Sequence, residues 1–206
     1  MGTPAVADVL KTGAVVWYAP VGETDPDDTS VGYGDDWGGD WERFGYTKEP
    51  LKFIYESEEA DIEVEEELAP INRFRIKENL TLETVLAELT ATYLEVAAGD
   101  QDTVVETPAG AAQKAVEDAG LGGVVVIGQH RWGFEGFRLD TDGDEQPLRI
   151  FIHKGTAMVN GEIEFSTKSD TYPGIPIQIK ALADTTQTAG QKLCMFQRVT
   201  APVTGA

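Results

Sequence analysis

The sequence predicts a mainly β protein with one main α-helix, organised as a single domain over residues 1–206. The second half of the chain consists of short runs rich in β-branched and aromatic residues, separated by turn signals such as TDGD and NG. One stretch of the first half carries apolar residues at helical spacing. Hydrophobic residues make up 41% of the chain, which is enough for a core even at a formal net charge of −20.

Residues 12–22 form the first predicted strand, because this β-rich run is closed by a proline and a glycine. A loop rich in Asp, Gly and Thr follows over residues 23–50, and a loop of this length usually has a function of its own. Trp37 and Trp41 stand within it. Large aromatic residues in such a loop either cover the core of their own chain or contact a partner.

A strand hairpin is predicted over residues 51–78, where residue parity separates two faces. Between residues 61 and 68 the odd positions are all acidic, whereas between 71 and 78 they are mostly basic. Opposite residues of an antiparallel pair share a face, so the apolar even positions can meet only if paired residue numbers have an even sum. With a loop at residues 69–71, the expected cross-strand ion pairs are Glu67–Arg73, Glu65–Arg75 and Glu63–Lys77.

The main helix is predicted over residues 82–97, between an N-cap at Thr81 and a stop at Gly99. Its apolar residues at helical spacing are Leu82, Val85, Leu86, Leu89 and Tyr93. A short second helix is predicted over residues 111–119. The remaining strands are predicted at residues 123–128, 131–139, 147–154, 161–166, 175–182 and 192–199. Both ends of the chain are expected to be flexible.

The sequence carries no recognisable catalytic motif and no spacing typical of a metal or cofactor site. Asp140, Asp142 and Asp144 match the first ligand positions of a calcium loop. The required glycine and final glutamate are missing, so residues 140–146 are interpreted as a hairpin turn. The one cysteine, Cys194, has no cysteine partner, and both histidines lie on predicted strands. We therefore expect a protein without enzymatic activity, cofactor or metal.

The negative charge limits the possible partners. An acidic surface repels free nucleic acid and anionic membranes, which argues against sequence-specific DNA binding and against membrane association. The chain has no apolar stretch of about 18 residues and no signal-like start. From these features we expect a soluble protein made inside the cell, without intrachain disulfides.

Seven short stretches of the sequence follow one another in this order: GAVVWYAPVGE, WERFGYTKEPLKF, NLTLETVLAELT, FEGFR, LRIFIHKGT, GEIEFS and IPIQIKALAD. Through them the chain resembles, over residues 13–199, the major tail tube proteins of long-tailed, non-contractile bacteriophages. The resemblance implies a β-sandwich or partial barrel flanked by one main helix. Six copies would close into a ring, in which their strands complete a large β-barrel, and stacked rings would form a hollow tube.

The resemblance also implies partners and a location. The partners would be further copies of the chain and the tape measure, tail terminator and distal tail proteins, while phage DNA passes through the tube without sequence-specific binding. The protein would be made in the cytoplasm of the host bacterium and would end in the tail of the virion. The alternatives are a tail terminator or neck ring protein, an acidic carbohydrate-binding β-sandwich and a carboxylate-based glycosidase.

Two groups of residues are candidates for these roles. The acids expected to face the lumen and repel phosphates are Glu56, Asp61, Glu63, Glu65 and Glu67. The loop residues expected to contact a neighbouring ring are Asp27, Asp28, Tyr33, Trp37 and Trp41. A sugar site would instead require aromatic side chains beside acids in a cleft, whereas these acids alternate with apolar residues along a strand.

Overall fold

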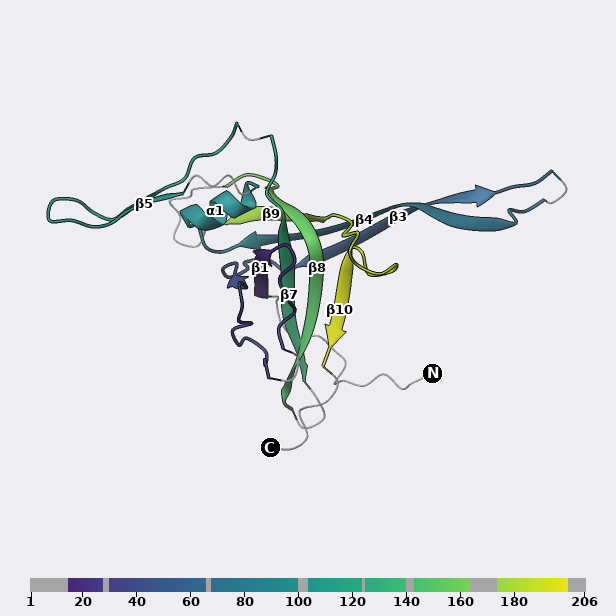
Figure 1. The fold of residues 1–206 in the computed structure, drawn as a ribbon, viewed down its shortest axis with the longest axis horizontal. Coiled ribbons are helices and arrows are strands. Elements are labelled where there is room, and N and C mark those ends of the chain that lie inside the picture. The colour runs from purple at the N-terminus through teal and green to yellow at the C-terminus, as the bar shows by residue number, and fades with distance from the viewer. Residues whose placement is uncertain are drawn as a thin grey trace.

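The computed structural model describes residues 15–27, 30–65, 68–99, 104–123, 125–139, 143–163 and 174–199. These residues form ten strands and one short helix (Figure 1). The elements in chain order are β1 (Val15–Pro20), β2 (Glu42–Arg43), β3 (Lys52–Ile62), β4 (Asn72–Leu86), α1 (Ala91–Ala97), β5 (Val105–Thr107), β6 (Val116–Asp118), β7 (His130–Leu139), β8 (Glu145–Val159), β9 (Ile175–Ala181) and β10 (Cys194–Arg198).

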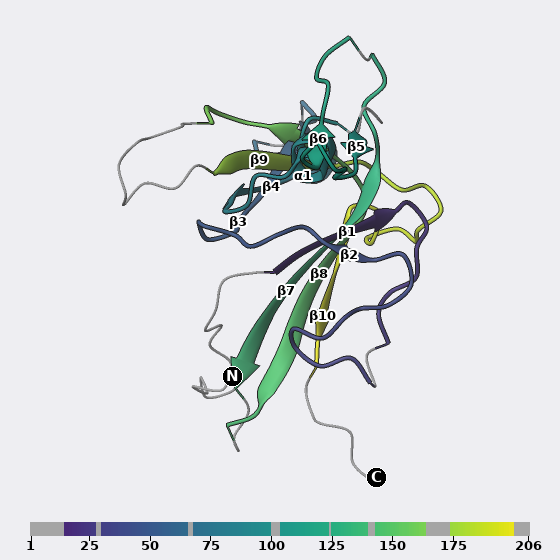
Figure 2. The same ribbon diagram turned by 90° about the vertical axis from the view of Figure 1, so that its left-hand side faces the viewer.

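Eight of the strands form one antiparallel sheet in the order β2-β1-β7-β8-β9-β4-β3, with β10 also paired to β8. The long strand β8 joins the two halves of this sheet. Its first part pairs with β7 as far as Gly155 and with β10 as far as Ile152, and its last part, from Gly155, pairs with β9. The sheet therefore folds into two layers, with β9, β4 and β3 across the top and β1, β7 and β10 below (Figures 1 and 2). The prediction of a mainly β, sandwich-like fold with one helix is confirmed.

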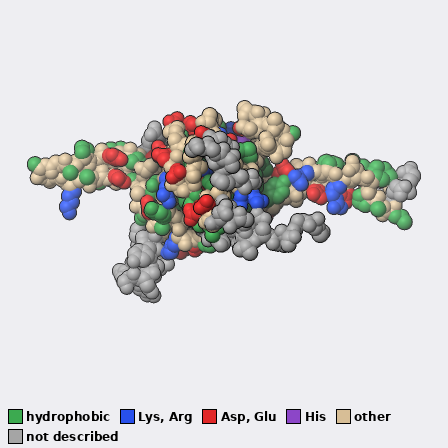
Figure 3. All heavy atoms as spheres, turned by 90° about the horizontal axis from the view of Figure 1, so that it is seen from below, with side chains coloured by type: hydrophobic (Ala, Val, Ile, Leu, Met, Phe, Trp, Pro, Cys, Tyr) green, Lys and Arg blue, Asp and Glu red, His purple; other side chains and the backbone are tan. Residues whose placement is uncertain are grey.

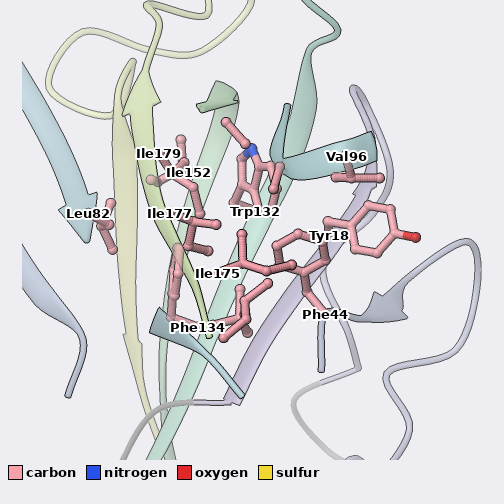
Figure 4. Packing of buried hydrophobic residues seen from close by; sticks show 14 of the residues in the cluster. Tyr18, Phe44, Leu82, Val96, Trp132, Phe134, Ile152, Ile175, Ile177 and Ile179 are labelled. Atoms are coloured by element: carbon pink, nitrogen blue, oxygen red, sulfur yellow. The ribbon is translucent and has the colours of Figure 1, made fainter. Parts of the chain in front are cut away.

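The main core lies between the two layers, because the strands alternate apolar and polar side chains across each sheet face. Figure 4 shows isoleucines of β9 packing towards aromatic residues of β1 and β7. The fully enclosed members include Val16, Phe44, Leu82, Leu86, Trp132, Ile152 and Ile175. A second, smaller cluster covers the opposite face of β1, β7 and β8 and consists of Trp17, Ala19, Trp37, Trp41 and Phe151.

The main helix is much shorter than predicted, because the first part of residues 82–97 belongs to β4. Leu82, Thr84 and Leu86 are buried alternately, and this part of β4 pairs with β9. The apolar residues fit both a helical and a strand period, and pairing with β9 favours the strand. The helix begins after Thr90, whose hydroxyl accepts a hydrogen bond from the Tyr93 backbone N–H at 3.1 Å.

Two further predictions are wrong. Residues 111–119 contain no helix, because β6 lies there and pairs antiparallel with β5. The described part of 123–128 contains no strand, and Val125 is 94% exposed. Strands do lie within or across residues 12–22, 131–139, 147–154, 175–182 and 192–199, as predicted. Residues 161–163 are not a strand, and the rest of 161–166 lies outside the described residues.

Residues 140–142 of the predicted turn lie outside the described residues, and residues 145–146 belong to β8. β7 and β8 pair antiparallel, and Leu139 stands opposite Glu145. Within the part of the chain that the structure describes, no helix is long and apolar enough to cross a membrane.

Candidate assembly surface

Beyond the core, β3 and β4 continue as a two-stranded arm, defined as residues 55–79, which projects to one side of the two layers (Figure 1). All residues of β3 are exposed except the half-buried Ala60, and β4 is exposed from Asn72 to Asn79. An isolated two-stranded hairpin is at best marginally stable in water. The arm is therefore the first candidate for a surface that another molecule covers.

A β-bulge divides the arm into a base and a distal half. Glu58 pairs with Lys77, but the next residue, Glu59, pairs with Arg75, so Ile76 is an extra residue on β4. One extra residue shifts the alternation of side chains along its strand by one position. Beyond the bulge, each side chain of β4 therefore lies on the side opposite to the one that regular alternation from the base would give it.

Contacts of Arg75 show this change of side directly. Tyr55 stands opposite the buried Leu80, on the core side of the arm. Arg75 donates a hydrogen bond to the Tyr55 hydroxyl at 2.8 Å and forms an ion pair with Glu78. Residues three apart in a regular strand point to opposite faces, so Arg75 and Glu78 can meet only because of the bulge.

The core side of the distal half carries a network of ion pairs. The Arg73 guanidinium donates two hydrogen bonds to Asp61, from Nε to Oδ1 at 2.6 Å and from Nη2 to Oδ2 at 3.1 Å. Its Nη1 also lies 3.7 Å from Glu59 Oε2. A two-point contact of this kind fixes the orientation of both side chains. The charges on this side are therefore largely compensated within one chain.

The pKa values in the network follow from these contacts. The hydrogen bonds from Arg73 lower the pKa of the Asp61 carboxyl below its ordinary value. The hydrogen bond from Arg75, followed by that from Tyr55, likewise lowers the pKa of Glu78. Both acids therefore stay ionised at neutral pH, and the network keeps its alternating charges.

The opposite side of the distal half is mostly apolar, with Asn72 beside Ile62 at its end. Ala60 stands opposite Phe74, and Ile62 lies two residues further along β3 on the same side. Phe74 is 51% exposed and Ile62 is 40% exposed. Figure 3 shows hydrophobic side chains along the arm on the right, towards its tip. We call Ala60, Ile62 and Phe74 the apolar strip.

The register predicted for this hairpin is wrong. Asp61, Arg73 and Arg75 share a face as predicted, but the bulge places Lys77 on the other face. Asp61, rather than Glu67, stands opposite Arg73, and Glu59, rather than Glu65, stands opposite Arg75. Lys77 pairs with Glu58, and their charged atoms lie 3.3 Å apart, so Lys77 does not pair with Glu63. The connection between the strands is longer than three residues, because β3 ends at Ile62 and β4 begins at Asn72.

The acids predicted to face a lumen lie in different environments. Glu56 is exposed on β3 opposite Asn79. Asp61 is paired with Arg73, so it is not one of the uncompensated charges. Glu63 and Glu65 are exposed in the connection after β3, and Glu67 lies outside the described residues. Glu56, Glu63 and Glu65 have no ion-pair partner among the residues that the structure describes.

Trp37 and Trp41 of the 23–50 loop are buried in their own chain, so they are not available to a neighbouring ring. Trp37 stacks on Trp17 at 5.0 Å between ring centroids, and the Trp41 indole donates to the Thr24 carbonyl at 2.7 Å. The ring of Tyr33 contacts Phe137 at 4.6 Å. These residues cover the outer face of the lower layer.

Of the two acids of the predicted loop surface, the structure describes one. Asp27 accepts a hydrogen bond from the Ser30 hydroxyl at 2.9 Å and is exposed, while Asp28 lies outside the described residues. Since Trp37 is buried, removal of residues 23–40 would uncover part of the core. A truncation of this loop therefore tests folding before it tests stacking.

A buried ion pair holds the loop in place, and the sequence analysis missed it. Glu135 and Arg149 stand opposite each other on β7 and β8, are fully buried, and have Oε1 and Nε 2.9 Å apart. Glu135 also accepts hydrogen bonds from the Gly34 N–H at 3.0 Å and the Trp37 indole at 3.3 Å. Arg149 donates to the Val31 carbonyl at 2.7 Å.

A sequence signal for this pair does exist. The turn predicted at residues 140–146 would place Glu135 opposite Arg149 if the hairpin were centred on Asp142. Two opposite charges inside otherwise apolar strands would then mark the pair. A third charged residue on the same face, Arg131, forms an ion pair with Asp25 at the start of the loop.

A second projection leaves the molecule on the side opposite the arm (Figure 1). It contains the β5–β6 hairpin, whose Val105 and Val116 are 59% and 44% exposed. Its pairing covers only residues 105–107 and 116–118. The described part of the chain thus presents two exposed hairpins pointing in opposite directions.

No group of three His, Cys, Asp or Glu residues in the described ranges is placed to hold a metal ion. The cavity at the base of the arm, lined in part by Lys52, Glu83 and Asn160, has a volume of about 160 Å³. Small-molecule sites usually occupy roughly 300–1,000 Å³. The projecting arm is therefore a stronger candidate site than this cavity.

Comparison with known proteins agrees with an assembly role. A search of curated proteins finds no similar sequence. The family model described as phage tail tube protein matches residues 7–195, which span both layers of the sheet, the arm and the second projection. The chain therefore belongs to the phage tail tube protein family, a family of structural proteins of the virion tail.

Proposed function

We propose that this chain is the tail tube subunit of a long-tailed, non-contractile phage. Six copies form a ring, rings stack into a hollow tube, and phage DNA passes through it. The observation that carries this proposal is the arm, which is exposed on both faces in the single chain although half of one face is apolar. A polymer of identical subunits supplies the missing cover.

Free strand edges support the same proposal. Among the described residues, β3 pairs only with β4 and β10 pairs only with β8. Exposed edges of this kind favour pairing with another chain. When one such surface binds a different surface of the next copy, the contact repeats, and it produces either a closed ring or a filament. A tube of stacked rings would need one contact that closes each ring and another that joins successive rings.

The charge of the chain supports the passage of DNA. The formal net charge is −20, so a wall built from many copies repels phosphate groups. In this proposal Glu56, Glu63 and Glu65 supply uncompensated charge at the inner wall, and Glu67 extends it. Asp61 contributes less, because Arg73 neutralises it. The tape measure, tail terminator and distal tail proteins would contact the ends or the lumen of the tube.

Negative-stain electron microscopy of the purified chain at increasing concentration tests the proposal. We expect six-membered rings and hollow tubes, with tubes favoured when tail initiator proteins are added. Single rings that never stack would instead support a terminator or neck protein. A strictly monomeric species at every concentration, even with initiator proteins present, would refute a tube subunit.

A further inference from the structure

The bulge at Ile76 gives the arm two halves with opposite polarity. At the base, the core side carries Phe53 beside the buried Leu80 and Leu82. In the distal half, the core side carries the Asp61–Arg73 ion pair, and the apolar residues lie on the other side. If Ile76 had a partner on β3, regular alternation would continue from the base and Phe74 would lie on the core side.

The two sides of the distal half differ in how far their side chains are already compensated within the chain. Arg73 and Arg75 on the charged side already have carboxylate partners within the chain. The apolar side has no such compensation, because Phe74 and Ile62 keep about half of their surface in water. Burying apolar surface is favourable by roughly 25 cal/mol per Å². Of the two sides, the apolar strip therefore gains more from a partner.

We propose that the apolar strip of Ala60, Ile62 and Phe74 docks on a second copy of this chain, and that the Ile76 bulge turns the strip away from its own core for this purpose. The inference rests on the proposed function and specifies which side of the arm makes the contact. A second copy is the partner because a tail tube consists of repeated copies of one chain. Arg73 and Arg75 already have carboxylate partners within the chain, so the charged side of the distal half offers a second copy less than the strip does.

Insertion of one alanine between Glu58 and Glu59 tests the role of the bulge. The inserted residue gives Ile76 a partner and restores unbroken alternation on both strands, which moves Ala60 and Phe74 to the core side and Asp61 and Arg73 to the strip side. We expect the variant to keep the thermal unfolding midpoint of the wild type, because the arm lies outside the core, and to lose assembly. Sedimentation of assembled material measures this, and wild-type assembly of the insertion variant would overturn the proposal.

A pair of substitutions separates the two sides of the arm. Phe74→Ser should raise the concentration needed for assembly by about five- to tenfold, the ratio expected when half a phenylalanine side chain loses its burial. Arg73→Ser alters the charged side of the same strand and is the matched control, with an assembly concentration close to that of the wild type. The reverse order of the two effects would contradict the proposal.

Cysteine labelling gives a readout that does not depend on assembly yield. In a Cys194→Ser background, Ile62→Cys lies on the strip and Asp61→Cys lies on the charged side. For each variant the rate of reaction with maleimide in assemblies is compared with the rate in its own monomer, because neighbouring charges also change thiol reactivity. Assembly should slow Ile62→Cys about tenfold and leave Asp61→Cys unchanged. Equal slowing of the two variants, or no slowing of Ile62→Cys, would show that no second copy covers the strip.

The labelling also separates this inference from the proposed function. If the wild-type chain forms single rings or dimers but no tubes, the tube function fails. Labelling in those oligomers still decides whether a second copy covers the strip. A chain that remains monomeric under all conditions would contradict both.

Discussion

Replacing Arg149 by methionine should destabilise the folded chain strongly, because it leaves the Glu135 carboxylate buried without its counter-charge. Both side chains are fully buried, and the lost contact joins Nε and Oε1 at 2.9 Å. Removing one partner of a buried ion pair typically costs about 3–5 kcal/mol. Glu135 keeps two donors, the Gly34 N–H and the Trp37 indole. We therefore expect a loss near the lower end, about 3 kcal/mol.

The double variant Glu135→Gln with Arg149→Met provides the sharper test. Glutamine keeps an acceptor oxygen for Trp37 but carries no charge, so the double variant has no isolated buried charge. Replacing a buried ion pair as a whole is often close to neutral. The free energy of unfolding should therefore fall by only about 1–2 kcal/mol, less than in either single variant.

Urea unfolding, followed by tryptophan fluorescence at concentrations below assembly, measures these values. The stacked Trp17 and Trp37 lie beside the pair and report on the loop that covers it. Arg73→Met, which removes an exposed ion pair, is the control and should leave the unfolding midpoint unchanged. If the two single effects add within about 0.5 kcal/mol in the double variant, the residues are not coupled and the reasoning is refuted.

Three further predictions concern local structure. Gly133→Ala would place a methyl carbon 2.2 Å from Cζ3 of Trp37, so we expect a loss of about 1–3 kcal/mol and greater fluorescence quenching of the loop tryptophans; an unchanged midpoint would contradict this packing. Thr90→Ala should cost about 1 kcal/mol in chemical unfolding, because the N-cap acceptor is lost; a neutral effect would show that the cap is dispensable. The pKa of Asp61 is lowered by Arg73, so this contact stabilises the arm above the ordinary carboxylate pKa of about 4 and is lost as the pH falls further. In Arg73→Gln, the pKa of Asp61 measured by carboxyl NMR titration should return to the ordinary value. An unchanged titration would contradict the ion pair.

Local patterns were sufficient for much of the fold. The strands at residues 131–139 and 175–182 follow from alternation and turn residues, and both are formed. Parity also predicted that Asp61, Arg73 and Arg75 share one face of the hairpin, apart from the apolar residues. These features depend on neighbours along the chain, so the sequence contains them directly.

The helix shows where local patterns were insufficient. Leu82 and Leu86 fit a helix of period 3.6 and also a strand of period two. Pairing of β4 with β9, which lies about 95 residues further along the chain, places them in a strand. Only the last part of the predicted segment, from Ala91, remains helical because its N-cap at Thr90 follows the end of the strand.

The candidate assembly surface depends partly on local sequence and partly on tertiary structure. The sequence by itself determined that the arm has an acidic and basic side and an apolar side, since alternation is a local property. Only the tertiary structure decided the register, the bulge at Ile76 and the burial of Trp37. Each of these depends on which distant strand or face a segment packs against. Several registers satisfy the same parity, and the contacts of the folded chain select one of them.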